Sequence, residues 1–158
     1  SNSFARFPPW DACVNASISF EFKTTQQEGI LMYVDDGGRY DFMEIMQRSG
    51  TIFLQLNIVD GREGRVEISV GNNLNDGRWH RVEVLRNRME TTLLVDGTPS
   101  SRYSFGSDFY FGNPADRKPV YFGGVPPGMA DSLHNLALPS VIYETRFEGD
   151  IRNVLYSN

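Results

Sequence analysis

The chain has 158 residues and a net charge of −5, and it is 40% hydrophobic and 13% aromatic. This length predicts a single domain over residues 1–158, because domains cluster near roughly 100–150 residues. The acidic balance argues against nucleic acid, whose phosphates favour a strongly basic face. No stretch of the sequence reaches the roughly 20 apolar residues that cross a bilayer, so we expect no membrane contact by this segment.

Alternation of apolar and polar residues is the dominant pattern and predicts strands. The clearest run sets Ile18, Phe20 and Phe22 against polar neighbours, whereas Ile30–Val34 is continuously apolar and suits a strand covered on both faces. Further strands are predicted at Ile52–Ile58, Val66–Val70, Val82–Val84, Leu93–Val95, Val120–Phe122, Val141–Tyr143 and Ile151–Leu155.

Turn residues separate these runs about every ten residues, which is typical of a sandwich, jelly roll or barrel. The predicted turns are Asp36–Gly38, Ser49–Gly50, Asp60–Gly61, Asn75–Gly77 and Asp96–Gly97. We therefore predict an all-β domain of two antiparallel sheets. The proline-rich segment 106–139 breaks the alternation, and such long loops either carry binding residues or cross between the sheets.

Residues 75–97 carry the pattern Asp-Gly-x-Trp-His-x-Val, then an arginine, then Leu-x-Val-Asp-Gly. This pattern predicts a turn at Asp76–Gly77, a strand that takes Trp79 into the core, and a hairpin partner that ends at Asp96–Gly97. It resembles the hallmark of laminin G-like (LNS) domains. The resemblance covers nearly the whole chain and implies a laminin G-like jelly-roll sandwich of the concanavalin-like kind.

Two shorter segments, Arg6–Cys13 and Gly123–Pro127, are similar to the first LNS module of the α-neurexins. That resemblance implies an extracellular, synaptic setting in the ectodomain of a single-pass plasma-membrane receptor. It also implies that the partners are extracellular domains of cell-surface or secreted proteins.

Two features bear on the compartment. Asn15 opens a glycosylation sequon just before a predicted strand, which is a plausible surface position. Cys13 is the single cysteine, and it is either a small buried hydrophobe or a thiol that seeks a partner. Many laminin G-like domains have a disulfide-bonded cysteine directly after the glycine of their final motif, and here Asp150 occupies that position.

The resemblance also implies a calcium site at the rim of the sandwich. Matched by position, its ligands would be the side chain of Asp41, the carbonyls of Ile58 and Phe111, and the side chain of Asn113. Calcium prefers such oxygen ligands. Because the alignment runs through an irregular loop, the last side chain could instead come from Asp108 or Asp116, and Asp41 could simply be an aspartate beside a turn.

Carbohydrate-cleaving sandwiches need two convergent carboxyl groups. Asp41 and Glu44 are three apart on a strand and point to opposite faces, so Glu44 is expected to face solvent or a salt bridge. Neither histidine has metal-ligand spacing, and Cys13 belongs to no nucleophile motif. We therefore predict no enzyme, with a glycoside hydrolase as the remote alternative.

Four arginines, Arg78, Arg81, Arg86 and Arg88, could form a basic strip able to bind acidic or sulfated glycans, or could simply be the solvated face of a hairpin. Two functional hypotheses thus remain open beside the enzyme. One is a protein-binding adhesion module, with calcium at the loop rim; the other is a lectin-like module for acidic glycans.

Overall fold

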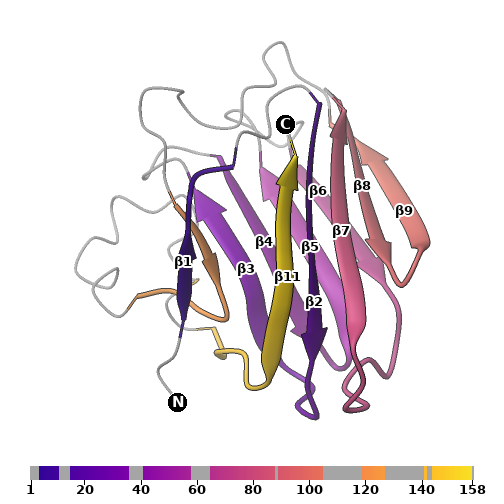
Figure 1. Cartoon of the computed structure of the whole chain (residues 1–158). Helices are drawn as coiled ribbons and strands as arrows, with labels where there is room; N and C mark the ends of the chain where they lie inside the picture. The colour runs from indigo at the N-terminus through magenta and orange to yellow at the C-terminus, as the bar shows by residue number, and fades with distance from the viewer. Residues whose placement is uncertain are drawn as a thin grey trace.

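The computed structural model describes residues 4–10, 15–35, 41–57, 65–87, 89–104, 119–126, 141 and 144–157 (Figure 1). These residues contain the following strands: β1 Ala5–Phe7, β2 Asn15–Lys23, β3 Gly29–Asp35, β4 Phe42–Arg48, β5 Thr51–Asn57, β6 Arg65–Val70, β7 His80–Asn87, β8 Glu90–Val95, β9 Thr98–Tyr103, β10 Val120–Phe122 and β11 Asp150–Ser157. In this part of the chain, no helix is long and apolar enough to cross a membrane.

The strands form two antiparallel sheets. Sheet A has six strands in the order β1-β10-β3-β4-β5-β6, and sheet B has five in the order β11-β2-β7-β8-β9. In Figure 1, strands β11, β2 and β7 of sheet B lie in front of β3 to β6. Successive strands change sheet after β1, β2, β6, β9 and β10, so the predicted two-sheet jelly-roll sandwich is confirmed.

The main core lies between the two sheets and is built by alternation. Ile18, Phe20 and Phe22 are buried on the inner face of β2. In the register of sheet B, Ile18 lies opposite Val84 and Phe20 opposite Val82. Opposed side chains point to the same face, so each strand pair contributes two apolar side chains to the core. The alternation in the sequence therefore marked the inner face correctly.

Strand β3 is buried along its whole length, as its continuous apolar sequence predicted. Leu31 and Val34 join the core between the sheets. A second hydrophobic cluster contains Ile30 and Tyr33 of β3 together with Phe42, Val125 and Val141. Because Val125 and Val141 lie outside the strands, the outer face of sheet A is covered by non-strand segments.

Two of the predicted hairpin turns have the backbone that their residues favour. Ser49 and Gly50 have φ of 51° and 75°, and Asp96 and Gly97 have φ of 50° and 83°. Two successive positive φ values are typical of the type I′ turn, whose twist matches that of the flanking strands. These turns fix the registers of the β4–β5 and β8–β9 hairpins.

Two parts of the strand assignment differ from the prediction. Strand β9 was missed because Thr98–Tyr103 is polar, and as an edge strand it tolerates Pro99 without needing an apolar face. A strand was predicted at Val141–Tyr143, but Val141 lies outside every strand and the next two residues lie outside the described residues. The predicted Val120–Phe122 strand is β10.

Candidate functional site

One rim of the sandwich gathers oxygen-bearing side chains at the ends of three strands of sheet A. Asp35 ends β3, Asp41 directly precedes β4, and Asn57 ends β5. Phe42 lies opposite both Asp35 and Asn57 in the register, so the three strand ends are adjacent. Both aspartates are only 8% exposed. The hydroxyl of Tyr33 donates a hydrogen bond of 2.8 Å to Asp35 Oδ2. This rim is at the upper end of Figure 1.

The structure describes only part of the set of residues that was predicted to bind calcium. Asp41 lies at this rim, but Ile58, Phe111 and Asn113 lie outside the described residues, as do Asp108 and Asp116. Carboxylate and amide oxygens are suitable calcium ligands, so the chemistry of the rim fits the ion. Across the described ranges, no group of three or more His, Cys, Asp or Glu side chains could hold a metal. The described residues thus supply part of a site at most.

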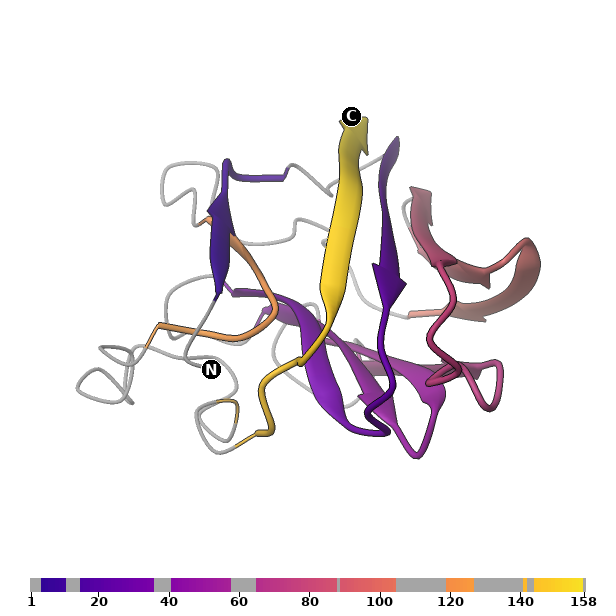
Figure 2. The ribbon, with the colours of Figure 1, turned by 60° about the horizontal axis from the view of Figure 1, so that its bottom comes forward.

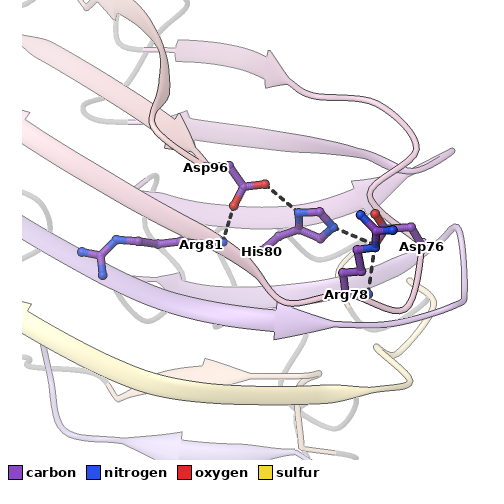
Figure 3. Close-up of polar contacts among 5 residues, drawn as sticks. All are labelled: Asp76, Arg78, His80, Arg81 and Asp96. Carbon is purple, nitrogen blue, oxygen red and sulfur yellow. Dashed lines mark hydrogen bonds and ion pairs between the residues drawn. The ribbon is translucent and has the colours of Figure 1, made fainter.

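The opposite end of the sandwich carries the Asp-Gly-x-Trp-His motif, which forms a polar clasp. His80 Nδ1 lies 2.6 Å from Asp96 Oδ2, and His80 Nε2 lies 2.8 Å from Asp76 Oδ1 (Figure 3). The same two carboxylates also accept backbone N–H bonds, from Arg78 to Asp76 and from Arg81 to Asp96. The clasp therefore joins the loop before β7 to the β8–β9 turn.

The charges of the clasp reinforce one another. Burial alone would lower the pKa of His80, but its hydrogen bonds to Asp96 and Asp76 outweigh burial and raise it. The hydrogen bond from His80 in turn lowers the pKa of Asp76. A ring with a carboxylate on each nitrogen is a donor at both positions, which requires the protonated imidazole. The clasp therefore stabilises the protonated form of His80.

The prediction that Trp79 enters the core is wrong. Its side chain is half-buried on the outside, with the Arg152 guanidinium 3.7 Å and the Lys23 ammonium 5.0 Å from the ring centroid. Strand β7 begins one residue later, and it is the His80 ring that lies against the core residue Phe22, at 5.6 Å between centroids. The motif thus places its tryptophan in a cation–π stack on the surface of sheet B.

The four arginines do not form one continuous strip. Arg78 and Arg81 are exposed, and Arg81 forms an ion pair of 3.2 Å with Glu83. Arg86 is only 2% exposed and donates to Thr91 Oγ1 at 2.6 Å, so its assignment to a solvated or glycan-binding face is wrong. It shares the inward orientation of the alternate β7 residues before it. Arg88 lies outside the described residues.

Two further predictions concern single side chains. Asn15 is exposed at the first position of β2, in keeping with a modified surface residue. Cys13 lies outside the described residues. Asp150, at the position where many domains that the sequence resembles have a cysteine, begins β11 and approaches Lys23 at 3.8 Å, a surface ion pair.

The expectation that Glu44 faces solvent is wrong. Its side chain has no exposed surface and lies on the outer face of sheet A, under the segments that cover that face. Burial raises the pKa of Glu44 to about 7. Sequence alternation missed this residue because the outer face of sheet A is itself covered, so a polar position on β4 did not imply exposure.

The sequence also gave no signal for a polar depression at the clasp end of the sandwich. One cavity of about 600 Å³ is lined by the β2–β3 loop, Asn75, Thr145, Arg146 and Glu148. A neighbouring cavity of about 370 Å³ shares Thr25, Gln26 and Glu148 with it. Figure 2 brings this end forward and shows the β2–β3 loop beside the segment that leads into β11.

Two facing antiparallel sheets, with the polar clasp at one end, define a jelly-roll sandwich domain. Residues 22–158 match the Laminin G domain family, and the chain belongs to that family. Laminin G domains are extracellular binding modules rather than enzymes.

Among known proteins, the chain is 45% identical to Neurexin 1 of Drosophila melanogaster over 99% of its own length, and 32% identical to Neurexin-3a of Danio rerio over 98%. It spans only 8–9% of the length of these relatives. Mouse laminin alpha1 chain domains LG4-5 have a similar structure, with a TM-score of 0.74 and 21% identity over 98% of this chain and 38% of that one. At that identity the likeness shows the fold.

Proposed function

We propose that the chain is a protein-binding module in the ectodomain of a neurexin-like, single-pass adhesion receptor, and that it acts at synapses. The observation that carries this proposal is the 45% identity to Neurexin 1, which extends over 99% of the chain. The partners would be extracellular domains of other cell-surface or secreted proteins.

The binding surface proposed is the rim around Asp35, Asp41 and Asn57. The strand ends at this rim bring two carboxylates and an amide together, and calcium prefers such oxygen ligands. We propose calcium there, with Asp41 as a side-chain ligand and with Ile58, Phe111 and Asn113, or a nearby aspartate, as the others. Such modules bind calcium at roughly 10⁻⁴–10⁻³ M and leave coordination positions that a partner's oxygen can occupy.

The test is binding of the chain, as a dimeric fusion, to a panel of cell-surface ectodomains with calcium and with a chelator. We expect saturable binding to at least one ectodomain, weakened by chelation and by Asp41→Asn. The matched control is Asp150→Asn, which removes an exposed carboxylate at the opposite end of the sandwich. Binding that responds equally to both substitutions, or to neither, would remove the rim from the proposal.

The lectin-like alternative loses much of its basis with Arg86 inside the protein and Arg81 paired to Glu83. It predicts affinity for heparin that falls steeply with salt, whereas the protein-binding proposal predicts partner binding that tolerates salt. Loss of heparin affinity in Arg78→Ala together with Arg81→Ala would favour the glycan hypothesis.

A further inference from the structure

The outer face of sheet B, which is toward the viewer in Figure 1, leaves large apolar side chains exposed. Five large hydrophobic side chains are exposed in the described part of the chain, and four of them belong to sheet B or to its β7–β8 turn: Leu85, Met89, Tyr103 and Leu155. Single exposed apolar residues are ordinary, but such a concentration on one sheet indicates a surface that something covers. The outer face of sheet A, by contrast, is already covered by the chain itself.

Strand β2 lies between β11 and β7 on this face. The even-numbered residues of β2 are in the core, so Asn15, Ser17 and Ser19 point outward. Leu85 of β7 lies opposite Ser17, and Leu155 of β11 lies opposite Ser19. Side chains that lie opposite each other point to the same face, so both leucines are on the outer face. Ser17 and Ser19 thus form a strip of small side chains between two leucines, called here the serine strip.

Asn15 lies at one end of the serine strip. It is the exposed first residue of β2, and with Ser17 it forms an acceptor sequence for an N-linked glycan. Asn87 is its partner in the register, so Leu85, on the same face, is a diagonal neighbour of Asn15 at about 7–8 Å. Leu155 lies opposite a residue four positions along β2, which is about 13 Å from Asn15. A glycan on Asn15 is therefore attached within reach of both leucines.

The composition of this face suits a carbohydrate better than a protein partner. Across the five strands, the row through Ser17 consists of Ser157, Ser17, Leu85, Thr92 and Ser101. Protein interfaces are depleted in serine and are enriched in aromatic side chains, methionine and arginine. Sugar rings carry hydroxyl groups at their edges and C–H groups on their faces. They can therefore hydrogen-bond to the hydroxyls of this row and pack on an isolated leucine.

We propose that Asn15 carries an N-linked glycan whose first sugars lie on the serine strip and cover Leu85 and Leu155. The glycan covers the outer face of sheet B as the segments around Val125 and Val141 cover that of sheet A. The proposal requires the extracellular setting of the domain but neither calcium nor a partner at the rim.

The modification transfers an oligosaccharide from a polyprenyl diphosphate carrier in the secretory pathway. The bond between the anomeric carbon of the first sugar and the diphosphate oxygen breaks, and that carbon forms a bond to Asn15 Nδ2. The amide nitrogen gives up one proton, and the polyprenyl diphosphate leaves. Because a secretory transferase catalyses this step, the domain contributes only the acceptor sequence, in which Ser17 supplies the required hydroxyl.

A glycan at this position limits where protein partners can bind. It is bulky and hydrated, so the apolar side chains beneath it are withdrawn from protein contacts. Strand β2 begins at the upper end of Figure 1, which is the end of the rim, but it belongs to the sheet opposite Asp35, Asp41 and Asn57. A partner of the rim would then approach from the side of sheet A, a consequence that rests on the proposed function.

The test is hydroxyl-radical footprinting, read by mass spectrometry, of the chain secreted from eukaryotic cells, before and after peptide N-glycosidase. The loss of the glycan mass, with the acceptor asparagine converted to aspartate, reports occupancy. We expect Leu85 and Leu155 to be oxidised about threefold more slowly in the glycosylated chain, because the glycan is bulky. Phe4 is the internal reference, since it is also 38% exposed but contacts Tyr121 of sheet A, and its oxidation should not change.

Two variants separate the glycan from the sequence that carries it. Asn15→Gln removes the acceptor and should give the footprint of the deglycosylated chain. Ser17→Thr is the matched control, because it changes the same acceptor sequence but preserves its function, and it should give the parent footprint. The enzymatic comparison decides the question without these variants if Asn15→Gln is not secreted.

Three results would overturn the proposal. The first is a secreted chain without a glycan on Asn15. The second is equal oxidation of Leu85 and Leu155 with and without the glycan. The third is protection of both leucines in the deglycosylated chain at the mass of a dimer, since a second copy would then cover the face. The footprint needs neither calcium nor a partner, so these failures are distinct from a failure of the rim to bind.

Discussion

The two ends of the sandwich differ in what their polar side chains are suited to bind. At the clasp end, His80 is held between two carboxylates at 2.6 and 2.8 Å, and each contact is closed within the domain. At the rim, strands β3, β4 and β5 end or begin in side chains whose oxygens suit an external cation. The motif by which the family is identified from sequence thus serves the fold, while the proposed binding surface lies at the other end.

This contrast separates recognition of a family from assignment of its function. The polar groups of a clasp bond to one another, and the geometry of the hairpin brings them together. We therefore expect the same contacts in every domain that has this motif. At the rim, Tyr33 bonds Asp35 within the domain, but the oxygens there also suit an external ligand, so we expect the rim residues to vary with the partner. Substitutions should therefore cost stability at the clasp end and binding at the rim.

The largest expected effect is at Gly149, beside the clasp. Its φ is +153°, and a Cβ built there would lie 2.2 Å from the Lys23 carbonyl oxygen and 3.0 Å from Thr24 Cβ. Because the first obstacle is a backbone oxygen at the end of β2 and the second belongs to the next residue, Gly149→Ala should destabilise the domain by about 3 kcal/mol or more. Chemical unfolding measures the free-energy change.

Gly97→Ala is the matched control for that substitution. Gly97 also has a positive φ, +83°, but a Cβ there meets nothing within 4 Å. It should cost only the backbone strain, about 1 kcal/mol. Equal losses for the two variants would show that strain alone, and not the close approach of β11 to β2, governs this end.

A smaller effect is expected at His80. His80→Gln keeps a polar group but removes the cation between Asp76 and Asp96, and we expect a loss of about 1–2 kcal/mol at about pH 6, discounted for the partial exposure of the clasp. The raised pKa of His80 means that its contribution is complete below the ordinary value of 6.5 and is lost as pH rises through the higher folded value.

The pH dependence of stability tests whether the clasp is charged. Thermal unfolding of the parent and of His80→Gln should diverge most in mild acid and converge in alkali. A parent whose advantage over His80→Gln grows with pH would show that the ring is neutral and the clasp uncharged. The variant Asn153→Ala, which changes a contact of Glu21 elsewhere on sheet B, should leave this pH dependence unchanged.

The fold could be predicted well because the alternation of apolar and polar residues indicates which face of each strand is buried. Phe20 and Phe22 pointed into the core, and the fully apolar β3 was covered on both faces. The prediction failed at two polar residues for different reasons. Glu44 faces the outer side of β4, and it is buried because that side is covered by another layer. Arg86 continues the inward alternation of Val82 and Val84, and it was assigned to solvent only because it is charged.

The candidate site was less predictable for a related reason. Asp41 could be located from a motif position, but its neighbours Asp35 and Asn57 come from strands that meet only through the register of sheet A. Trp79 was assigned to the core because tryptophan is large and apolar, whereas it is the cations of β2 and β11 that hold it at the surface. Contacts between distant strands decide such cases, and a single sequence does not give them.

The smallest expected effect on stability, and the one that tests the contrast most directly, is at Asp41. Without calcium, Asp41→Asn should change the free energy of unfolding by less than about 0.5 kcal/mol, because the amide keeps the shape and hydrogen-bonding oxygen of the carboxylate. With calcium at about 1 mM, the parent should gain roughly 0.4–1.4 kcal/mol if its dissociation constant is about 0.1–1 mM, and the variant should gain nothing. Thermal unfolding with and without the ion measures both values.

A parent that gains no stability from calcium would leave the rim as a partner surface without a metal. A variant that loses several kcal/mol in the absence of the ion would mean that Asp41 stabilises the fold as His80 does. The contrast between a clasp end that stabilises the fold and a rim that binds partners would then be wrong.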